Sequence, residues 1–140
     1  MQGKLETIID NLKQQLNENP VDIEAAVMLG NYYYDRSDSA QSIVYYQYAL
    51  HLNPNQPGVH TDLGTMYWKN GDIGIAERTF REVISRYPDF GNAYLNLGLL
   101  LARGKQQVKE ARIVWQQLLD LCPNHPAAEK AQQLLATSLQ

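Results

Sequence analysis

The sequence is poor in cysteine and in clustered positive charge, two features that would point to a particular class of function. It has one cysteine, Cys122, in 140 residues, so no disulfide can form within the chain and no paired cysteines are available for a metal. Charged residues make up 19% of the chain, the formal net charge is −3, and the 12 Lys and Arg residues are scattered. We therefore expect no nucleic-acid-binding surface.

Long apolar runs are also missing. No run approaches the roughly 18 residues that a membrane-spanning helix needs. The first residues, Met1–Glu6, lack the apolar core of a secretory signal. We expect no membrane insertion by this segment, and the localisation stays open between the cytoplasm and the soluble part of a membrane-anchored or periplasmic protein.

Motifs that carry chemistry are absent as well. The sequence has no phosphate-binding glycine loop, no dinucleotide-binding glycine motif and no H-E-x-x-H pair. Its histidines, His51, His60 and His125, fall in three different parts of the chain. Cys122 precedes Pro123 at an expected helix end, where the helix dipole disfavours a thiolate. We expect no catalytic residue, no metal site and no cofactor, and the chain is not predicted to be an enzyme.

A repeat of about 34 residues runs through most of the chain. Pro20, Pro54, Pro88 and Pro123 are spaced by 34, 34 and 35 residues, and the Leu-Gly pairs at 29–30, 63–64 and 97–98 are 34 apart. Each glycine is followed by a small residue and then a large ring on the next helix, at Ser42 and Tyr46, Ala76 and Phe80, and Ala111 and Trp115. A glycine allows two helices to approach closely, the ring fills the groove towards the next pair, and the proline ends the second helix.

This pattern resembles the tetratricopeptide repeat over about three quarters of the chain. The resemblance implies an all-α fold, a right-handed α-solenoid of three helix-turn-helix pairs at about 23–56, 57–90 and 91–125. The expected helices are 23–35 with 39–52, 57–69 with 73–86, and 91–103 with 107–121. The segment 110–126, in the last repeat, is similar to bacterial c-type cytochrome assembly proteins and membrane-anchored repeat proteins.

Each end of the solenoid is predicted to be closed by one more helix. An apolar stripe at helical spacing precedes the first repeat and indicates an N-terminal half-repeat helix: Leu5, Ile8, Ile9, Leu12 and Leu16. A C-terminal capping helix is expected from Pro126, with Ala128, Ala131, Leu134, Leu135 and Leu139 as its buried stripe. We therefore predict a single domain over residues 1–140.

The three repeats differ where the chain turns between the two helices of a pair. The second repeat has Gly71 and the third Gly104 at this turn, whereas the first has Ser37. A left-handed turn costs a residue other than glycine about 1 kcal/mol. The third repeat carries one extra residue, which we place in the 104–110 connection, where lengthening a loop costs little.

The resemblance implies that the first helix of each pair lines a concave groove in which a partner binds. Helical spacing places Tyr34 and Trp68 in this groove without a role in the repeat core, and such aromatic residues are favoured as binding anchors. The predicted partner-binding residues are Val27, Asn31, Tyr34, Thr61, Asp62, Thr65, Trp68, Lys69, Asn92, Leu95, Asn96, Leu99 and Arg103.

The predicted function is a non-catalytic scaffold that binds a protein or peptide segment. Relatives that bind chaperone tails hold a carboxylate with cationic side chains, but the corresponding positions here are Val27, Asn31, Asp62, Asn92 and Asn96. Without a cation the carboxylate loses its charge-assisted bonds, so we predict no carboxylate clamp. Two alternatives stay open: an assembly module of a bacterial envelope system such as c-type cytochrome biogenesis, and a structural module that forms a homo-oligomer through its end helices.

Overall fold

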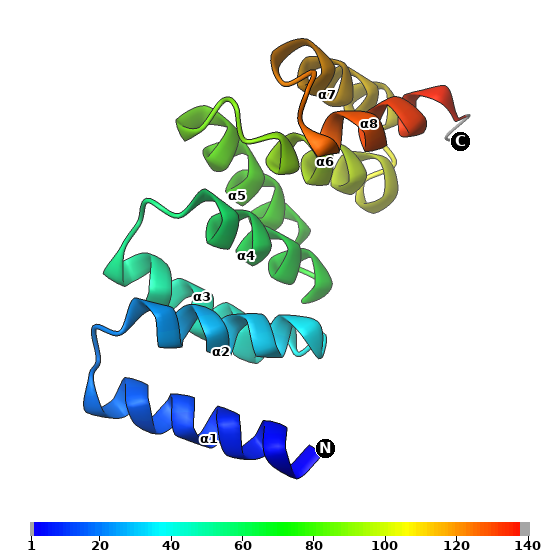
Figure 1. Cartoon of the computed structure of the whole chain (residues 1–140). Coiled ribbons are helices and arrows are strands. Elements are labelled where there is room, and N and C mark those ends of the chain that lie inside the picture. The colour runs from blue at the N-terminus through cyan, green and yellow to red at the C-terminus, as the bar shows by residue number, and fades with distance from the viewer. Residues whose placement is uncertain (1, 138–140) are drawn as a thin grey trace. The chain divides into compact units, whose positions relative to one another are not determined.

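The computed structural model describes residues 2–137, which form eight α-helices and one short π-helix, with no strand among them. The chain divides into two compact units that meet between Asn70 and Gly71. The first unit contains α1 (Gln2–Glu18), α2 (Ile23–Asp35), α3 (Ser39–Leu52) and α4 (Pro57–Lys69). The second contains α5 (Ile73–Arg86), α6 (Gly91–Leu99), the π-helix η1 (Leu100–Gly104), α7 (Val108–Leu121) and α8 (Pro126–Ala136) (Figure 1). The all-α repeat fold expected from the sequence is confirmed, whereas a single domain over 1–140 stays a prediction.

Helices α2 and α3 approach most closely where a tyrosine ring lies against a glycine. A Cβ atom at Gly30 would lie 2.4 Å from the ring of Tyr46, a distance that no side chain larger than hydrogen tolerates. The Ser42 hydroxyl donates a hydrogen bond of 2.9 Å to the Gly30 carbonyl, and the Tyr46 hydroxyl donates one of 2.6 Å to Asn31 Oδ1. The Leu-Gly pair and the following small and aromatic residues thus form one contact.

The same contact recurs in the second unit between α6 and α7. A Cβ atom at Gly98 would lie 2.1 Å from Trp115 Nε1. Trp115 is fully buried, and its Nε1 donates a hydrogen bond of 3.3 Å to the Leu95 carbonyl. The ring therefore packs against the glycine of its own helix pair. The repeat pattern predicted only that the ring fills the groove towards the next pair.

In the first unit the ring also reaches the following helix, as the sequence predicts. Tyr46 forms a core cluster with Leu63 and Met66 of α4, all at most 5% exposed. Tyr34 and Tyr67 pack against this cluster while remaining only partly buried. Tyr46 lies on α3 and contacts both α2 and α4, so its side chain links three helices.

The turns within the pairs use left-handed backbone at one position each. Ser37 adopts φ +58° and Gly71 adopts φ +90°, as their places in the repeat predict. In the third repeat the left-handed residue is Gln106, with φ +54°, so the assignment of this turn to Gly104 is wrong. Two of the three turns therefore strain a residue other than glycine, at about 1 kcal/mol each.

The extra residue of the third repeat lies within the helix rather than in the connection after it. The last turn of the first helix widens into η1, where the Lys105 amide donates to the Leu100 carbonyl at 3.1 Å. Leu100 and Leu101 are both completely buried. A π-turn absorbs one residue while leaving both leucines in the core, whereas an ordinary α-turn would rotate the later residues by about 100°. Our placement of the insertion in the 104–110 connection is therefore corrected.

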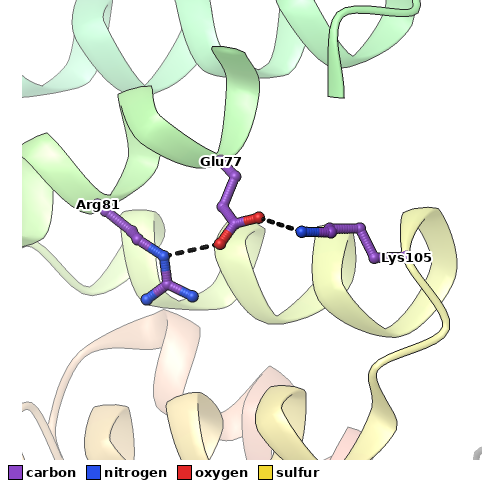
Figure 2. A network of polar contacts seen from close by, with 3 residues as sticks. All are labelled: Glu77, Arg81 and Lys105. Carbon is purple, nitrogen blue, oxygen red and sulfur yellow. Dashed lines mark hydrogen bonds and ion pairs between the residues drawn. The ribbon is translucent and has the colours of Figure 1, made fainter. Parts of the chain in front are cut away.

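A small polar network fixes the segment that follows η1. Glu77 on α5 accepts a hydrogen bond from Arg81 Nε at 2.9 Å and pairs with Lys105 Nζ at 2.7 Å (Figure 2). The hydrogen bond from Lys105 is the main cause that lowers the pKa of Glu77, and Arg81 adds to it. The pair Glu77 and Lys105 joins two elements that are 28 residues apart in the sequence.

The two end helices are covered to different extents. On α1, Ile9 is buried and Leu12 and Leu16 are half-buried, but Leu5 and Ile8 are 43% and 50% exposed. The predicted α1 stripe is therefore only partly covered. On α8, Ala128, Ala131 and Leu134 are buried as expected. Leu135 is half-buried, and Leu139 lies outside the described residues.

Candidate partner-binding site

The predicted groove residues of the first unit lie on α2 and α4, and Tyr34 interacts with both Asp62 and Thr65. Asn31 is exposed and its Oδ1 accepts the Tyr46 hydroxyl, while Val27, Tyr34 and Thr65 are half-buried. The Tyr34 and Tyr46 ring centroids are 6.4 Å apart with planes tilted by 59°. Tyr34 therefore packs on the core while remaining partly exposed, so the expectation that it has no role in the repeat core is wrong.

Asp62 is the electrostatic centre of this set. It is half-buried, and the structure gives it no ion pair or hydrogen bond among the described residues. Burial raises the pKa of Asp62 to about 6, and the negative charge of Asp35 on α2 adds to this shift. Burial is the main cause that raises the pKa of Tyr34, and the negative charge of Asp62 adds to it. A hydrogen bond with Thr65 acts in the opposite direction and lowers this pKa. Burial and the charge of Asp62 also raise the pKa of Tyr46.

A pH dependence follows from the raised pKa of Asp62. Because folding disfavours its charged form, stability is lost as the pH rises from about 3.8 through about 6. We expect Asp62→Asn to be more stable than the natural chain at pH 7.5 by about 1 kcal/mol, a value reduced for the partial exposure of the group. The difference should vanish below pH 4. Urea unfolding at both pH values measures it.

A direct titration of Asp62 complements this measurement. We expect its carboxyl carbon to titrate in an NMR experiment with a midpoint near pH 6, and Asp35→Asn to lower that midpoint. A midpoint near the ordinary value of 3.8 would contradict the burial and charge described above.

The remaining predicted residues of α4 differ in accessibility. Thr61 is only 2% exposed and its hydroxyl donates to the Pro57 carbonyl at 2.7 Å, so its side chain is not available to a partner. Trp68 is half-buried. Lys69 is exposed and donates to Ser37 Oγ at 3.2 Å. All predicted residues of the first unit except Thr61 are therefore at least partly accessible: Val27, Asn31, Tyr34, Asp62, Thr65, Trp68 and Lys69.

The second unit holds the other five predicted residues on α6 and η1. Asn92 and Arg103 are exposed, and Leu95, Asn96 and Leu99 are half-buried. Two of them also serve the fold through their backbone, because the Leu95 carbonyl accepts Trp115 Nε1 and the Arg103 carbonyl accepts Gln106 Nε2 at 3.2 Å. The five residues lie along consecutive turns that begin at the N-terminus of α6, as their spacing predicts.

Chemistry other than partner binding has little support in the described residues. In residues 2–137 no group of three or more His, Cys, Asp or Glu side chains is placed to hold a metal ion. Cys122 is 8% exposed, its thiol donates to the Asp89 carbonyl at 3.4 Å, and burial raises its pKa. In the same part of the chain no helix is long and apolar enough to cross a membrane.

Comparison with known proteins supports the same fold. A family model for the tetratricopeptide repeat matches residues 61–126. Two solved structures that resemble the chain are the Arabidopsis OM64 TPR domain (20% identity, TM-score 0.68, 81% of this chain and 93% of that one) and MamA (18%, 0.77, 96% and 81%). A third is the first TPR of Spaghetti (RPAP3) bound to the HSP90 peptide SRMEEVD (21%, 0.65, 82% and 94%). No curated protein sequence matches.

The helix pairs and the repeated glycine-to-ring contact define a helical repeat protein. Residues 61–126 match the tetratricopeptide repeat model, and the similar structures show that the chain has the fold of tetratricopeptide repeat proteins. Proteins of this family are generally interaction modules without catalytic activity.

Proposed function

We propose that the chain is a non-catalytic protein-interaction module that binds a peptide segment on the predicted partner-binding side chains of α2 and α4 in the first unit. The observation that carries this proposal is the set of accessible aromatic, amide and hydroxyl side chains on α2 and α4, together with the half-buried Asp62 on α4. Tyr34 and Trp68 offer apolar surface at little entropic cost, while Asn31 and Thr65 offer hydrogen-bonding groups.

The charge of this surface determines which peptides fit. Asp35 and Asp62 are both acidic, and the five positions that correspond to a carboxylate clamp contain no Lys or Arg. An incoming carboxylate would meet a second negative charge in a partly dehydrated place, which is costly. We therefore propose an extended or helical segment that is neutral or basic where it faces Asp62, and not an acidic C-terminal tail.

Replacement of Trp68 tests the groove. We expect Trp68→Ala to reduce recovery of specific partners by about tenfold in affinity purification with quantitative mass spectrometry, because buried aromatic anchors contribute 1 kcal/mol or more. Lys109→Ala, an exposed change on α7, is the matched control and should leave recovery unchanged. Equal recovery by both variants and the natural chain would show that the groove is not the binding surface.

Tyr34 needs a milder change because it also packs on the core. Tyr34→Phe removes only the hydroxyl and keeps the ring beside Tyr46 and Leu63.

The peptide SRMEEVD, the ligand in the RPAP3 structure, is the negative probe. We expect no binding of this peptide by calorimetry, and tight binding would contradict the exclusion of a carboxylate clamp.

Self-association is a second candidate function, favoured by the exposed apolar residues of α1. Leu5 and Ile8 lie one turn apart and are 43% and 50% exposed. Two copies could cover this surface with each other. Sedimentation at two concentrations tests this, and a strictly monomeric chain removes the candidate. A role as an assembly module of a bacterial envelope system stays a prediction.

A further inference from the structure

The outer surface of α3 contains no charged residue. Helix α3 has no Asp, Glu, Lys or Arg, whereas α5, the second helix of the next repeat, has five and α7, that of the last repeat, has four. The exposed side chains of α3 are Ala40, Gln41, Val44, Gln47 and His51. Exposed helix faces usually carry charges, so this face has the composition of a surface that is covered by something else.

An open pocket of about 680 Å³ lies beside this surface, between α3 and the last turns of α1. Apolar groups of Leu16, Pro20, Val44, Tyr45 and Tyr48 line it, together with the polar side chains of Lys13, Asn17 and Gln47. Val44 is 56% exposed, so a valine side chain in the pocket wall lies largely in water. The pocket belongs entirely to the first unit.

Contacts behind the pocket hold its walls in place. The Tyr48 hydroxyl donates a hydrogen bond to the Pro20 carbonyl, which joins α3 to the turn after α1. The Tyr45 ring is stacked on Tyr33 of α2, with centroids 5.8 Å apart and planes 4° from parallel. Gln47 Nε2 donates to the Tyr67 hydroxyl at 2.5 Å. A preformed wall lowers the entropic cost of binding.

The charge at the rim of the pocket is positive. Lys13 Nζ lies 5.6 Å from the centre of the Tyr33 ring, and a hydrogen bond with Tyr33 is the main cause that raises its pKa. Within residues 2–137 Lys13 makes no ion pair, and Asp10, one turn earlier, acts on it only at longer range. A ligand carboxylate at the rim would therefore meet a cation that makes no ion pair among the described residues.

We propose that this pocket binds a partner peptide in which a large apolar side chain stands next to an Asp or Glu residue. The apolar side chain occupies the space above Val44 and Tyr45, and the neighbouring carboxylate pairs with Lys13. The amide groups of Asn17 and Gln47 supply hydrogen bonds to the peptide backbone at the edge. This surface is formed by α1, α3 and the turn after α1 and includes none of the α2 and α4 residues that the proposed function uses, so it is a second binding surface with the opposite charge preference.

NMR titration of the full chain with short capped peptides tests the proposal. The probes are acetyl-Trp-Glu-amide, acetyl-Trp-Gln-amide and acetyl-Ala-Glu-amide, each raised to about 10 mM because so few atoms bind weakly. We expect shift changes centred on Lys13, Val44 and Tyr45. The Glu probe should bind about 3 to 5 times more tightly than the Gln probe, the size of one exposed ion pair. The Ala probe should not bind.

Two variants separate the apolar contact from the charge. Lys13→Met keeps the aliphatic stem and should make the Glu and Gln probes bind equally, whereas Val44→Asp should abolish binding of both. The control is Ile113→Asp, because Ile113 occupies the equivalent repeat position on α7 and is 60% exposed. It should leave binding unchanged, and unaltered circular dichroism shows that each variant folds.

Three outcomes would overturn the proposal. Shift changes at residues away from the pocket would place the probe elsewhere. Equal affinity for the Glu and Gln probes in the natural chain would remove the role of Lys13. Shift changes at Val44 and Tyr45 that grow with protein concentration without any probe, together with dimer formation in sedimentation, would make a second copy of the chain the occupant.

Discussion

Gly98→Ala is expected to lower the free energy of unfolding by about 3 kcal/mol. The added methyl group would lie 2.1 Å from Trp115 Nε1 and 2.5 Å from the Trp115 Cε2 atom, well inside van der Waals contact. Trp115 cannot withdraw easily because it is fully buried and hydrogen-bonded to the Leu95 carbonyl. Overpacking of a rigid core costs 1 to 3 kcal/mol and more when backbone must move. Urea unfolding monitored by circular dichroism measures the loss.

Gly74→Ala is the matched control for this change. Gly74 is also helical, in the first turn of α5, but beyond its chain neighbours and the nearby backbone of its own helix no atom lies within 4 Å of a Cβ placed there. Alanine favours the helix and restricts the unfolded chain, so we expect a gain of about 0.5 kcal/mol. A similar loss in both variants would mean that backbone conformation, and not the close approach of α6 and α7, decides the effect.

Leu63→Ala is expected to cost about 3 kcal/mol, the typical loss when a buried leucine is truncated. Leu63 is 5% exposed and belongs to the cluster with Tyr46 and Met66 that joins α3 to α4. The loss combines the hydrophobic transfer energy of the removed atoms with the cavity that remains. Thermal and urea unfolding both report it.

The control for Leu63 is a leucine that is not packed. Leu121 is 57% exposed at the end of α7, and Leu121→Ala should change stability by less than about 0.5 kcal/mol. A loss below 1 kcal/mol for Leu63→Ala would show that its side chain is not held between packed helices.

The sequence predicts which side chains of the candidate site share a helix face, but not their chemistry. Helical spacing placed Asn31, Tyr34, Asp62 and Thr65 on related faces because a helix returns every 3.6 residues. Spacing could not show that Thr61 is buried or that Asp62 faces Asp35, since both depend on how α2 and α4 approach. The pocket at Val44 was missed, although the absence of charged residues from α3 is a signal that the sequence alone carries.

By itself the sequence determined the repeat and the close approach of the paired helices at Gly30 and Gly98, because both follow from residues at fixed spacing along one chain. It placed the left-handed turn at Ser37 and at Gly71. Tertiary structure decided where the extra residue of the third repeat goes. Keeping both Leu100 and Leu101 buried favours a π-turn at the end of the helix over a longer loop, and the left-handed residue then becomes Gln106. The tertiary structure also decided the charge environment of Asp62 and Lys13. Burial and the distance to groups on other helices set the pKa of a side chain, and the spacing of residues along the sequence predicts neither.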